Sequence, residues 1–193
     1  MSKPRILAFG GSLRRDSLNQ KLAAIAAEGA REAGAEVTLI KLSDFPMPLF
    51  DEDLEAKIGK PEEARHLKDL FLSHQGLIIA SPEYNSGYSA ALKNSIDWVS
   101  RVDGPDEPAI SALTGKSAVI MAAAHGGLGG TRGLVVLRML LGNLGITQLP
   151  DQVGIPSAYQ AFGPDGRLVD PKQEAAVKTL GAKLAEQLKK LKA

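Results

Sequence analysis

The segment of the chain best suited to chemistry is the run from Gly10 to Asn19. It joins the apolar stretch Ile6–Phe9 to an amphipathic helical stretch and reads Gly10-Gly11-Ser12-Leu13-Arg14-Arg15-Asp16-Ser17-Leu18-Asn19. The start of a helix offers free N–H groups and the positive end of the backbone dipole. These groups can surround a phosphate dianion together with four side chains: Ser12, Arg14, Ser17 and Asn19. The pattern predicts a phosphorylated cofactor. The plainer alternative is an ordinary turn in which Ser17 only caps the helix.

This segment differs from the two commonest nucleotide-binding loops. It has neither the G-x-G-x-x-G spacing of dinucleotide-binding folds nor a Walker A sequence. The second expected strand ends in Ile40-Lys41-Leu42, without the acid that would bind a ribose there. A loop rich in hydroxyl groups better suits a terminal phosphate that is held by several short donors.

A second loop, residues 81–88, follows the apolar run Ile78–Ala80 and reads Ser81-Pro82-Glu83-Tyr84-Asn85-Ser86-Gly87-Tyr88. Pro82 restricts its own backbone and that of Ser81, and Asn85 and Gly87 tolerate left-handed angles. A loop stiffened in this way can present fixed N–H and C=O groups to the polar edge of a flat heterocycle.

A third loop, residues 124–132, is dominated by glycine. Gly126, Gly127, Gly129 and Gly130 allow the backbone to approach a ligand closely. His125 is either a hydrogen-bonding partner of that ligand or of a substrate, or a plain loop histidine.

Strand and helix patterns alternate along the chain, which predicts an α/β fold with a five-stranded parallel sheet. Ligands bind beyond the carboxyl ends of the strands in either common doubly wound strand order. The three loops are therefore expected to meet at one edge of the sheet. The expected strands are Arg5–Phe9, Glu36–Lys41, Gly76–Ala80, Ser117–Ala123 and a weaker one near Gln148–Gly154.

Five helices are expected between and after these strands. The first begins at Ser17, with Gln20 completing a capping box and Gly34 ending the helix. The others cover about residues 62–75, 91–102, 131–144 and 172–192. In the third helix, Asp97 and Arg101 are spaced to form an ion pair. Residues 42–60 are expected to form a long loop.

Composition narrows the class of protein. The 193 residues suit one domain spanning the whole chain. With 23 basic and 22 acidic residues, the chain lacks the excess of positive charge that binding to nucleic acid or an acidic membrane would favour. Cysteine is absent and the three histidines lie far apart, so no metal site is expected. No apolar run reaches the ~18 residues of a membrane span, and the start of the chain resembles no signal peptide. We expect a cytoplasmic protein.

Two motifs taken together resemble the NADPH-dependent FMN reductase family, which includes flavodoxin-like quinone, chromate and azo-dye reductases. The first is Gly-Ser-x-Arg-x-x-Ser-x-Asn at residues 11–19. The second is Pro-Glu-Tyr-Asn at 82–85, followed by Leu-Lys-Asn-x-Ile-Asp-Trp at 92–98. The likeness spans about residues 6–144. One departure is Ala124, where relatives often carry a hydroxyl residue.

The resemblance implies a flavodoxin-like sheet in the order 2-1-3-4-5 and a bound FMN. It implies that the FMN phosphate lies at Ser12, Arg14, Ser17 and Asn19. It also implies that the isoalloxazine ring is lined by two segments, the first comprising Pro82, Glu83, Tyr84 and Asn85 and the second comprising His125, Gly126, Gly127 and Gly129.

The fourth expected helix is apolar nearly all round, through Leu134-Val135-Val136-Leu137-Arg138-Met139-Leu140-Leu141. A helix of this kind must be buried on every side, which predicts a subunit interface. The resemblance likewise implies a homodimer or homotetramer, which we expect to form through the third and fourth helices. Trp98 is expected in the core or in that contact. Trp98 and the loop Pro46–Asp53 are candidates either for that contact or for covering the flavin of a neighbouring subunit.

The expected cleft lacks a carboxylate pair, a Ser/His/Asp set and a metal cluster, so the sequence disfavours hydrolytic and acid–base enzymes. A redox cofactor carries its own chemistry. We therefore predict an FMN-dependent oxidoreductase with ping-pong kinetics. It passes hydride from NADPH or NADH through FMN N5 to a small-molecule acceptor such as a quinone, a flavin, an azo compound or a metal oxyanion. Two alternatives stay open: a flavodoxin-type electron carrier without substrate turnover, and a ligand-sensing protein of the same fold.

Overall fold

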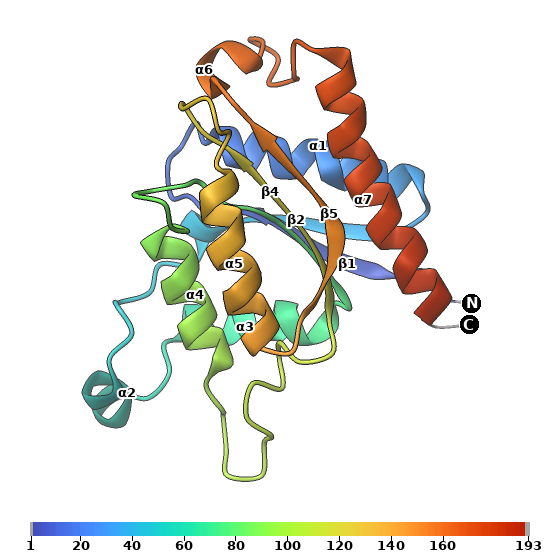
Figure 1. Ribbon diagram of the computed structural model, residues 1–193. Helices are drawn as coiled ribbons and strands as arrows, with labels where there is room; N and C mark the ends of the chain where they lie inside the picture. The colour runs from blue at the N-terminus through green and yellow to red at the C-terminus, as the bar shows by residue number, and fades with distance from the viewer. Residues whose placement is uncertain (1, 192–193) are drawn as a thin grey trace.

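The computed structural model describes residues 2–191, and its centre is a five-stranded parallel sheet in the order β2-β1-β3-β4-β5 (Figure 1). This confirms the predicted fold class and strand order. Each strand lies within about two residues of its predicted position: β1 Arg5–Gly10, β2 Glu36–Lys41, β3 Gly76–Ala80, β4 Ser117–Ala123 and β5 Thr147–Ile155.

Helices cover both faces of the sheet, because alternate residues of each central strand point to opposite faces. Ile6 and Ala8 of β1 pack in a core with α1 (Leu18–Glu32) and α7 (Pro171–Leu191). Leu7 and Phe9 pack on the other side with α3 (Glu62–Ser73), α4 (Ala90–Ser100) and α5 (Thr131–Asn143). Strands β3 and β4 are buried along their whole length, as expected for parallel strands covered on both faces.

The predicted helices are present, and the C-terminal one is described to Leu191, since Lys192 lies outside the described residues. Residues 42–60 are not the continuous loop that we expected. They contain a short 3-10 helix η1 (Leu42–Asp44) and helix α2 (Glu52–Ile58), and a further short helix α6 (Ala158–Ala161) was also missed. Helix α2 buries none of its residues, so it has no apolar stripe for a sequence pattern to reveal.

Residues 46–50 form a strap that is fastened to α4. The Pro48 carbonyl accepts hydrogen bonds from Trp98 Nε1 at 2.8 Å and from Asn94 Nδ2 at 3.0 Å, and Phe50 N donates to Asn94 Oδ1 at 2.7 Å. The Phe50 ring meets the Trp98 ring edge-on at 5.0 Å. Trp98 is fully buried within its own chain. Its place is therefore the core, the first of the two alternatives that the sequence left open, and its side chain has no exposed surface for a subunit contact.

The predicted ion pair between Asp97 and Arg101 is also wrong. Asp97 pairs instead with Lys93 at 2.7 Å, one helical turn earlier. Arg101 lies just past the end of α4 and pairs with Glu55 of α2 at 2.8 Å. Glu55, the carboxylate that takes the place of Asp97 beside Arg101, belongs to helix α2, which the sequence pattern did not predict.

Two buried lysines hold the segment after α4 against α3. Lys68 Nζ lies 2.6 Å from Glu107 and 2.7 Å from Asp103, and Lys60 pairs with Asp103 at 2.5 Å. Both ammonium groups also donate to the Arg101 carbonyl. Hydrogen bonding from Lys68, together with Ser111, lowers the pKa of Glu107 to about 2.

This shift predicts acid-dependent loss of stability. The pKa of Glu107 is lower in the folded chain than in the unfolded chain, so its contribution is complete above the unfolded value and is lost as pH falls toward 2. Glu107→Gln should therefore flatten the fall in urea midpoint between pH 5 and pH 2. Equal slopes for wild type and variant would contradict the assignment.

Among the described residues, no helix combines the length and apolar character that crossing a membrane requires.

Candidate functional site

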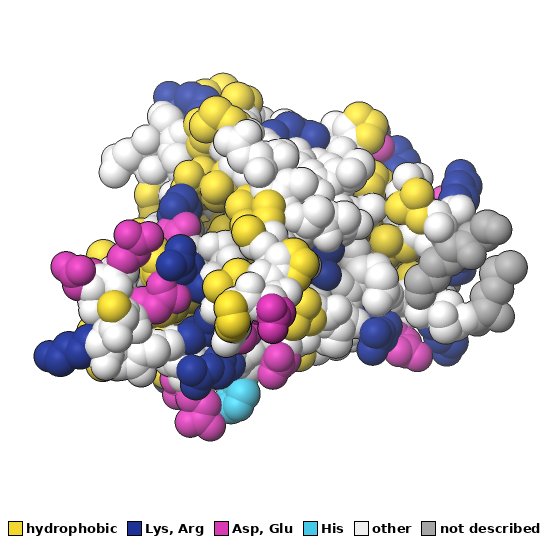
Figure 2. Space-filling view, turned by 90° about the horizontal axis from the view of Figure 1, so that it is seen from below, with side chains coloured by type: hydrophobic (Ala, Val, Ile, Leu, Met, Phe, Trp, Pro, Cys, Tyr) yellow, Lys and Arg dark blue, Asp and Glu magenta, His cyan; other side chains and the backbone are white. Residues whose placement is uncertain are grey.

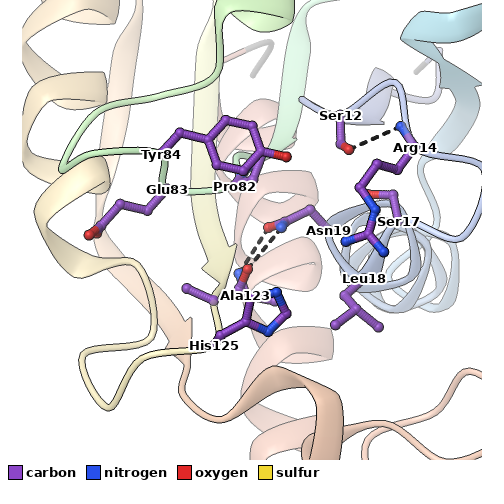
Figure 3. Close-up of a pocket in the computed structure, with 11 residues that line it drawn as sticks. Ser12, Arg14, Ser17, Leu18, Asn19, Pro82, Glu83, Tyr84, Ala123 and His125 are labelled. Atoms are coloured by element: carbon purple, nitrogen blue, oxygen red, sulfur yellow. Dashed lines mark hydrogen bonds between the residues drawn. The ribbon is translucent and has the colours of Figure 1, made fainter.

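The loops after β1, β3 and β4 meet at the carboxyl edge of the sheet and enclose a pocket (Figure 3). Eight of the twelve predicted site residues line it: Ser12, Arg14, Ser17, Asn19, Pro82, Glu83, Tyr84 and His125. The pocket is completed by Leu18, Ala123 and Ala124, none of which was predicted as a site residue. Four predicted site residues are not among the lining residues: Asn85, Gly126, Gly127 and Gly129.

The first loop lines the pocket with hydrogen-bond donors. Ser17 caps α1 by accepting from Gln20 N at 3.2 Å, and the Ser12 hydroxyl accepts from Arg14 N at 3.2 Å. Each hydroxyl therefore keeps its own hydrogen for another acceptor. The N–H groups of the first turn of α1, those of Leu18 and Asn19, have no acceptor within the helix. The end of this loop is accordingly rich in donors.

Gln20 does not complete the predicted capping box. Its side chain leaves the helix end and bridges two strands, accepting from Gly10 N and donating to the Ile40 carbonyl, both at 2.8 Å. It thereby ties the ends of β1 and β2 to α1. A Cβ at Gly10 would lie 2.7 Å from Gln20 N, so this close approach requires glycine.

Asn19 uses most of the hydrogen-bonding groups of its side chain within the protein, whereas the sequence pattern predicted a contact with the phosphate alone. Its Nδ2 donates to the Ala123 carbonyl and its Oδ1 accepts from Ala123 N, both at 2.9 Å, as Figure 3 shows. The amide thus pairs with the last residue of β4 as a neighbouring strand would. One Nδ2 hydrogen remains for a ligand. The main role of this side chain is to join the first and third loops.

The second loop ends in a tight turn. The N–H and C=O groups of Tyr84 and Gly87 bond to each other at 2.9 and 3.0 Å. Asn85 and Ser86 have φ of 51° and 65°, which defines a turn with two left-handed residues. Of the two residues noted as tolerating left-handed angles, Asn85 adopts one and Gly87 does not, and Ser86 is the second left-handed residue of the turn. Tyr84 lines the pocket, and Asn85 projects into solvent.

Among the described residues, Glu83 is the only acidic one that lines the pocket, and its carboxylate points away from the pocket (Figure 3). The carboxylate accepts from Gly133 N at 2.9 Å and lies 3.2 Å from Arg132. Both partners belong to the first turn of α5, where the helix dipole favours a negative charge. Glu83 therefore fastens the second loop to α5 and adds no negative charge beside the donors of the first loop.

The third loop contributes His125, whose ring stacks on that of Tyr159 from α6 at 3.7 Å and 14°. Tyr159 is far away in the sequence, and no local pattern indicates the contact. Gly126 and Gly127 are exposed, with open space around them. Gly129 has φ of 61° and packs on β5, where a Cβ would lie 2.8 Å from the carbonyl carbon of Gly154. Packing therefore explains why residue 129 is glycine.

The chemistry of the pocket suits a phosphate attached to a flat ring. Hydroxyl and N–H donors and the Arg14 guanidinium gather at one end, and no carboxylate among the described residues is directed at them. At the other end, the walls consist of flat or small side chains, those of Pro82, Tyr84, Ala123 and His125. No group of three or more metal-ligating side chains is present in the described part of the chain. The donor set therefore fits the phosphate of a phosphorylated flavin.

Comparison with known proteins agrees with this geometry. The sequence profile of the family described as NADPH-dependent FMN reductase matches residues 4–160. An NAD(P)H-dependent FMN reductase of Pseudomonas aeruginosa is 36% identical over 169 residues, covering 87% of this chain and 86% of the relative. A quinone reductase of Escherichia coli is 33% identical over 139 residues, covering 72% of this chain and 70% of the relative.

The structure is also similar to a solved flavoenzyme, the NAD(P)H:(acceptor) oxidoreductase FerB of Paracoccus denitrificans. The two share a TM-score of 0.77 at 25% identity, with 97% of this chain and 98% of that chain covered. The family match spans all three loops of the pocket and the five described strands of the sheet that positions them. The chain therefore belongs to the NADPH-dependent FMN reductase family.

Proposed function

We propose that the pocket binds FMN and that this chain uses it to transfer electrons from NAD(P)H to a small-molecule acceptor. The observation that carries the proposal is the donor set at the start of α1, at which no carboxylate in the described part of the chain is directed. When bound, FMN supplies the two-electron redox chemistry that oxidation of NAD(P)H and reduction of an acceptor both need.

The phosphate of FMN would be held by Ser12, Arg14 and Ser17, with the N–H groups of the first turn of α1 and the remaining Nδ2 hydrogen of Asn19. A charge-assisted hydrogen bond contributes roughly 1.5–3 kcal/mol, whereas a helix dipole adds about 0.3–1 kcal/mol. The number of donors, more than the dipole, therefore sets the affinity for the phosphate.

The isoalloxazine ring would be lined by backbone atoms of the second loop and by the third loop near His125. The bond from Glu83 to α5 keeps the second loop in place for this role. Ring contacts with Asn85, Gly126, Gly127 and Gly129 stay predictions, since these residues are not among those that line the pocket.

We propose that the electron donor and the acceptor use the same exposed side of the pocket in turn, which gives ping-pong kinetics. The support is that the pocket is a single depression formed by the three loops. Quinones, free flavins, azo compounds and metal oxyanions are the proposed acceptors, and the names of the relatives favour quinones and flavins.

The test is a visible spectrum of the purified protein, followed by anaerobic addition of NADPH and, separately, NADH. The proposal predicts a yellow protein with a flavin absorption band that bleaches on adding a dinucleotide and returns on adding a quinone. A colourless protein that takes up no added FMN and shows no thermal shift with it would contradict the proposal.

We also propose that the protein is a homodimer or homotetramer whose contact includes α5. This helix buries Leu134, Leu137 and Leu141 but leaves Val135 and Met139 65% and 62% exposed. A single chain therefore leaves one apolar face of α5 uncovered, the situation from which the subunit interface was predicted. Figure 2 views the side of the molecule that carries α3, α4 and α5, where hydrophobic side chains lie through the middle of the face. A second copy would remove this apolar surface from water.

Met139→Glu should shift this assembly toward the monomer, because it places a charge in the proposed contact. Sedimentation velocity at micromolar concentration measures the change, and Ala176→Glu, which adds the same single negative charge at an exposed position of α7, is the control. A wild type that sediments only as a monomer would remove the proposal.

A further inference from the structure

A second depression lies beside the pocket and shares two of its residues, Ser12 and Arg14. Its remaining lining residues come from the first loop, from α1, from the end of β2 and from the segment after it: Leu13, Arg15, Gln20, Lys41, Ser43 and Asp44. Three of the side chains around it are cationic, those of Arg14, Arg15 and Lys41, and one is a carboxylate.

The strand order explains why these cations gather there. Lys41 is the last residue of β2 and is paired in parallel register with Gly10, the last residue of β1. Both strands therefore end at the same level, and Lys41 lies beside the start of the loop that carries Arg14 and Arg15. These three residues are exposed, so water and ligands can reach them.

None of the three cationic side chains forms an ion pair or hydrogen bond with another described residue. Other cations near carboxylates in this chain do form pairs: Arg167 pairs with Glu28 at 2.6 Å and Lys178 with Glu32 at 2.7 Å. Like charges that are grouped without a partner repel one another, and an anion would relieve that repulsion. The excess of positive charge around the depression therefore suits the binding of a second anion.

The carboxylate of Asp44 indicates that the anion also carries a group that can donate a hydrogen bond. A carboxylate beside three cations is unsuited to a bare phosphate ion, but it can accept a hydrogen bond from a hydroxyl group. A ribose that carries a phosphate monoester presents both groups, a dianion and a neighbouring hydroxyl. NADPH contains such a ribose at its adenosine end, and NADH lacks the 2′-phosphate.

We propose that Arg15 and Lys41 bind the 2′-phosphate of NADPH, with Asp44 toward the ribose hydroxyl, and that the chain therefore prefers NADPH over NADH. The inference rests on the proposed function for NAD(P)H as electron donor. Arg14 borders both depressions and is assigned to the FMN phosphate, so the test uses only the two cations outside the pocket.

The first arm of the test measures kcat/KM for NADPH and for NADH, with a quinone acceptor, in Arg15→Ala, Lys41→Ala and the double variant. Because a lost charge-assisted bond corresponds to roughly a tenfold or larger change, each single variant should lower the NADPH value about tenfold and the double variant about 100-fold. The NADH value should change less than about twofold. Lys57→Ala, which removes an exposed cation from α2, is the matched control and should leave both values unchanged.

The second arm measures binding without turnover. Adenosine 2′,5′-bisphosphate and 5′-AMP are titrated into the FMN-loaded protein by calorimetry. The wild type should bind the bisphosphate at least about tenfold more tightly than 5′-AMP, and the double variant should lose this difference. Asp44→Asn removes the carboxylate that lines the depression and keeps an oxygen that can accept a hydrogen bond, so it should tighten binding of the bisphosphate, the opposite sign to Arg15→Ala.

Two results would overturn the inference. One is that the double variant keeps the wild-type ratio of kcat/KM for NADPH to kcat/KM for NADH; a tenfold loss of FMN affinity beside that result would assign the depression to the FMN phosphate. The other is that the double variant still binds adenosine 2′,5′-bisphosphate more tightly than 5′-AMP. If the wild type oxidises neither dinucleotide, the proposed function fails, and the bisphosphate titration still decides this inference on its own.

Discussion

Asn19→Ala is expected to destabilise the folded chain by about 2–6 kcal/mol and to weaken FMN binding at least about tenfold. The side chain bonds both the N–H and the carbonyl of Ala123, and Asn19 and Ala123 are buried. The variant leaves both backbone groups without their partner, and each such loss costs about 1–3 kcal/mol. The same bonds hold the first loop against the third, so the pocket loses its shape along with its stability.

Urea unfolding of the FMN-free protein measures the first effect, and flavin fluorescence titration measures the second. Asn143→Ala removes an exposed amide at the end of α5 and is the matched control, with an expected change below about 0.5 kcal/mol. If Asn19→Ala unfolds at the same urea concentration as wild type, the two bonds to Ala123 contribute nothing and the described role of Asn19 is wrong.

Gly181→Ala is expected to lower the free energy of unfolding by about 3 kcal/mol or more. In a chain of this size, that loss lowers the melting temperature by roughly 6–12 °C. Helices α1 and α7 cross in close contact, and a Cβ at Gly181 would overlap the carbonyl oxygen of Ala26 and lie 2.8 Å from its carbon. Gly29 of α1 meets the backbone of Lys178 in the same way. Backbone atoms cannot turn aside as a flexible side chain can, so the helices must separate.

The control for Gly181→Ala is another helical glycine, Gly142 in α5, around which a new Cβ would meet nothing within 4 Å. Gly142→Ala should raise stability by up to about 1 kcal/mol, since alanine loses less backbone entropy in a helix. Differential scanning calorimetry compares the two variants. A small effect at both positions would show that α1 and α7 do not pack as closely as described.

The sheet was predictable because its central strands are covered on both faces. A strand such as Ile78–Ala80 reads as an uninterrupted apolar run, and Gly and Pro mark its ends. Helix α2 was missed because it packs no apolar face. Its local signals were nevertheless present: Asp51 caps it, acidic residues fill its first turn and Lys57 lies in its last turn. Weighing capping chemistry as heavily as apolar spacing would have identified this helix.

The pocket was predictable at the level of loops and less so at the level of side chains. Parallel strands end at one edge of a sheet, so three loops that follow strands had to meet there. What each side chain does depends on tertiary neighbours. Gln20 bonds two strands, Glu83 turns to α5 and His125 stacks on Tyr159. Partners this remote in sequence leave no local pattern.

The measurement that tests the central claim most directly is a comparison of FMN with riboflavin, which lacks the phosphate. Both are titrated into the flavin-free protein by fluorescence quenching under the same conditions. Since several charge-assisted bonds go to the phosphate, FMN should bind at least about 100-fold more tightly, and Arg14→Ala should reduce this ratio without removing it. Equal affinities for FMN and riboflavin would show that the donors at the start of α1 do not hold a phosphate.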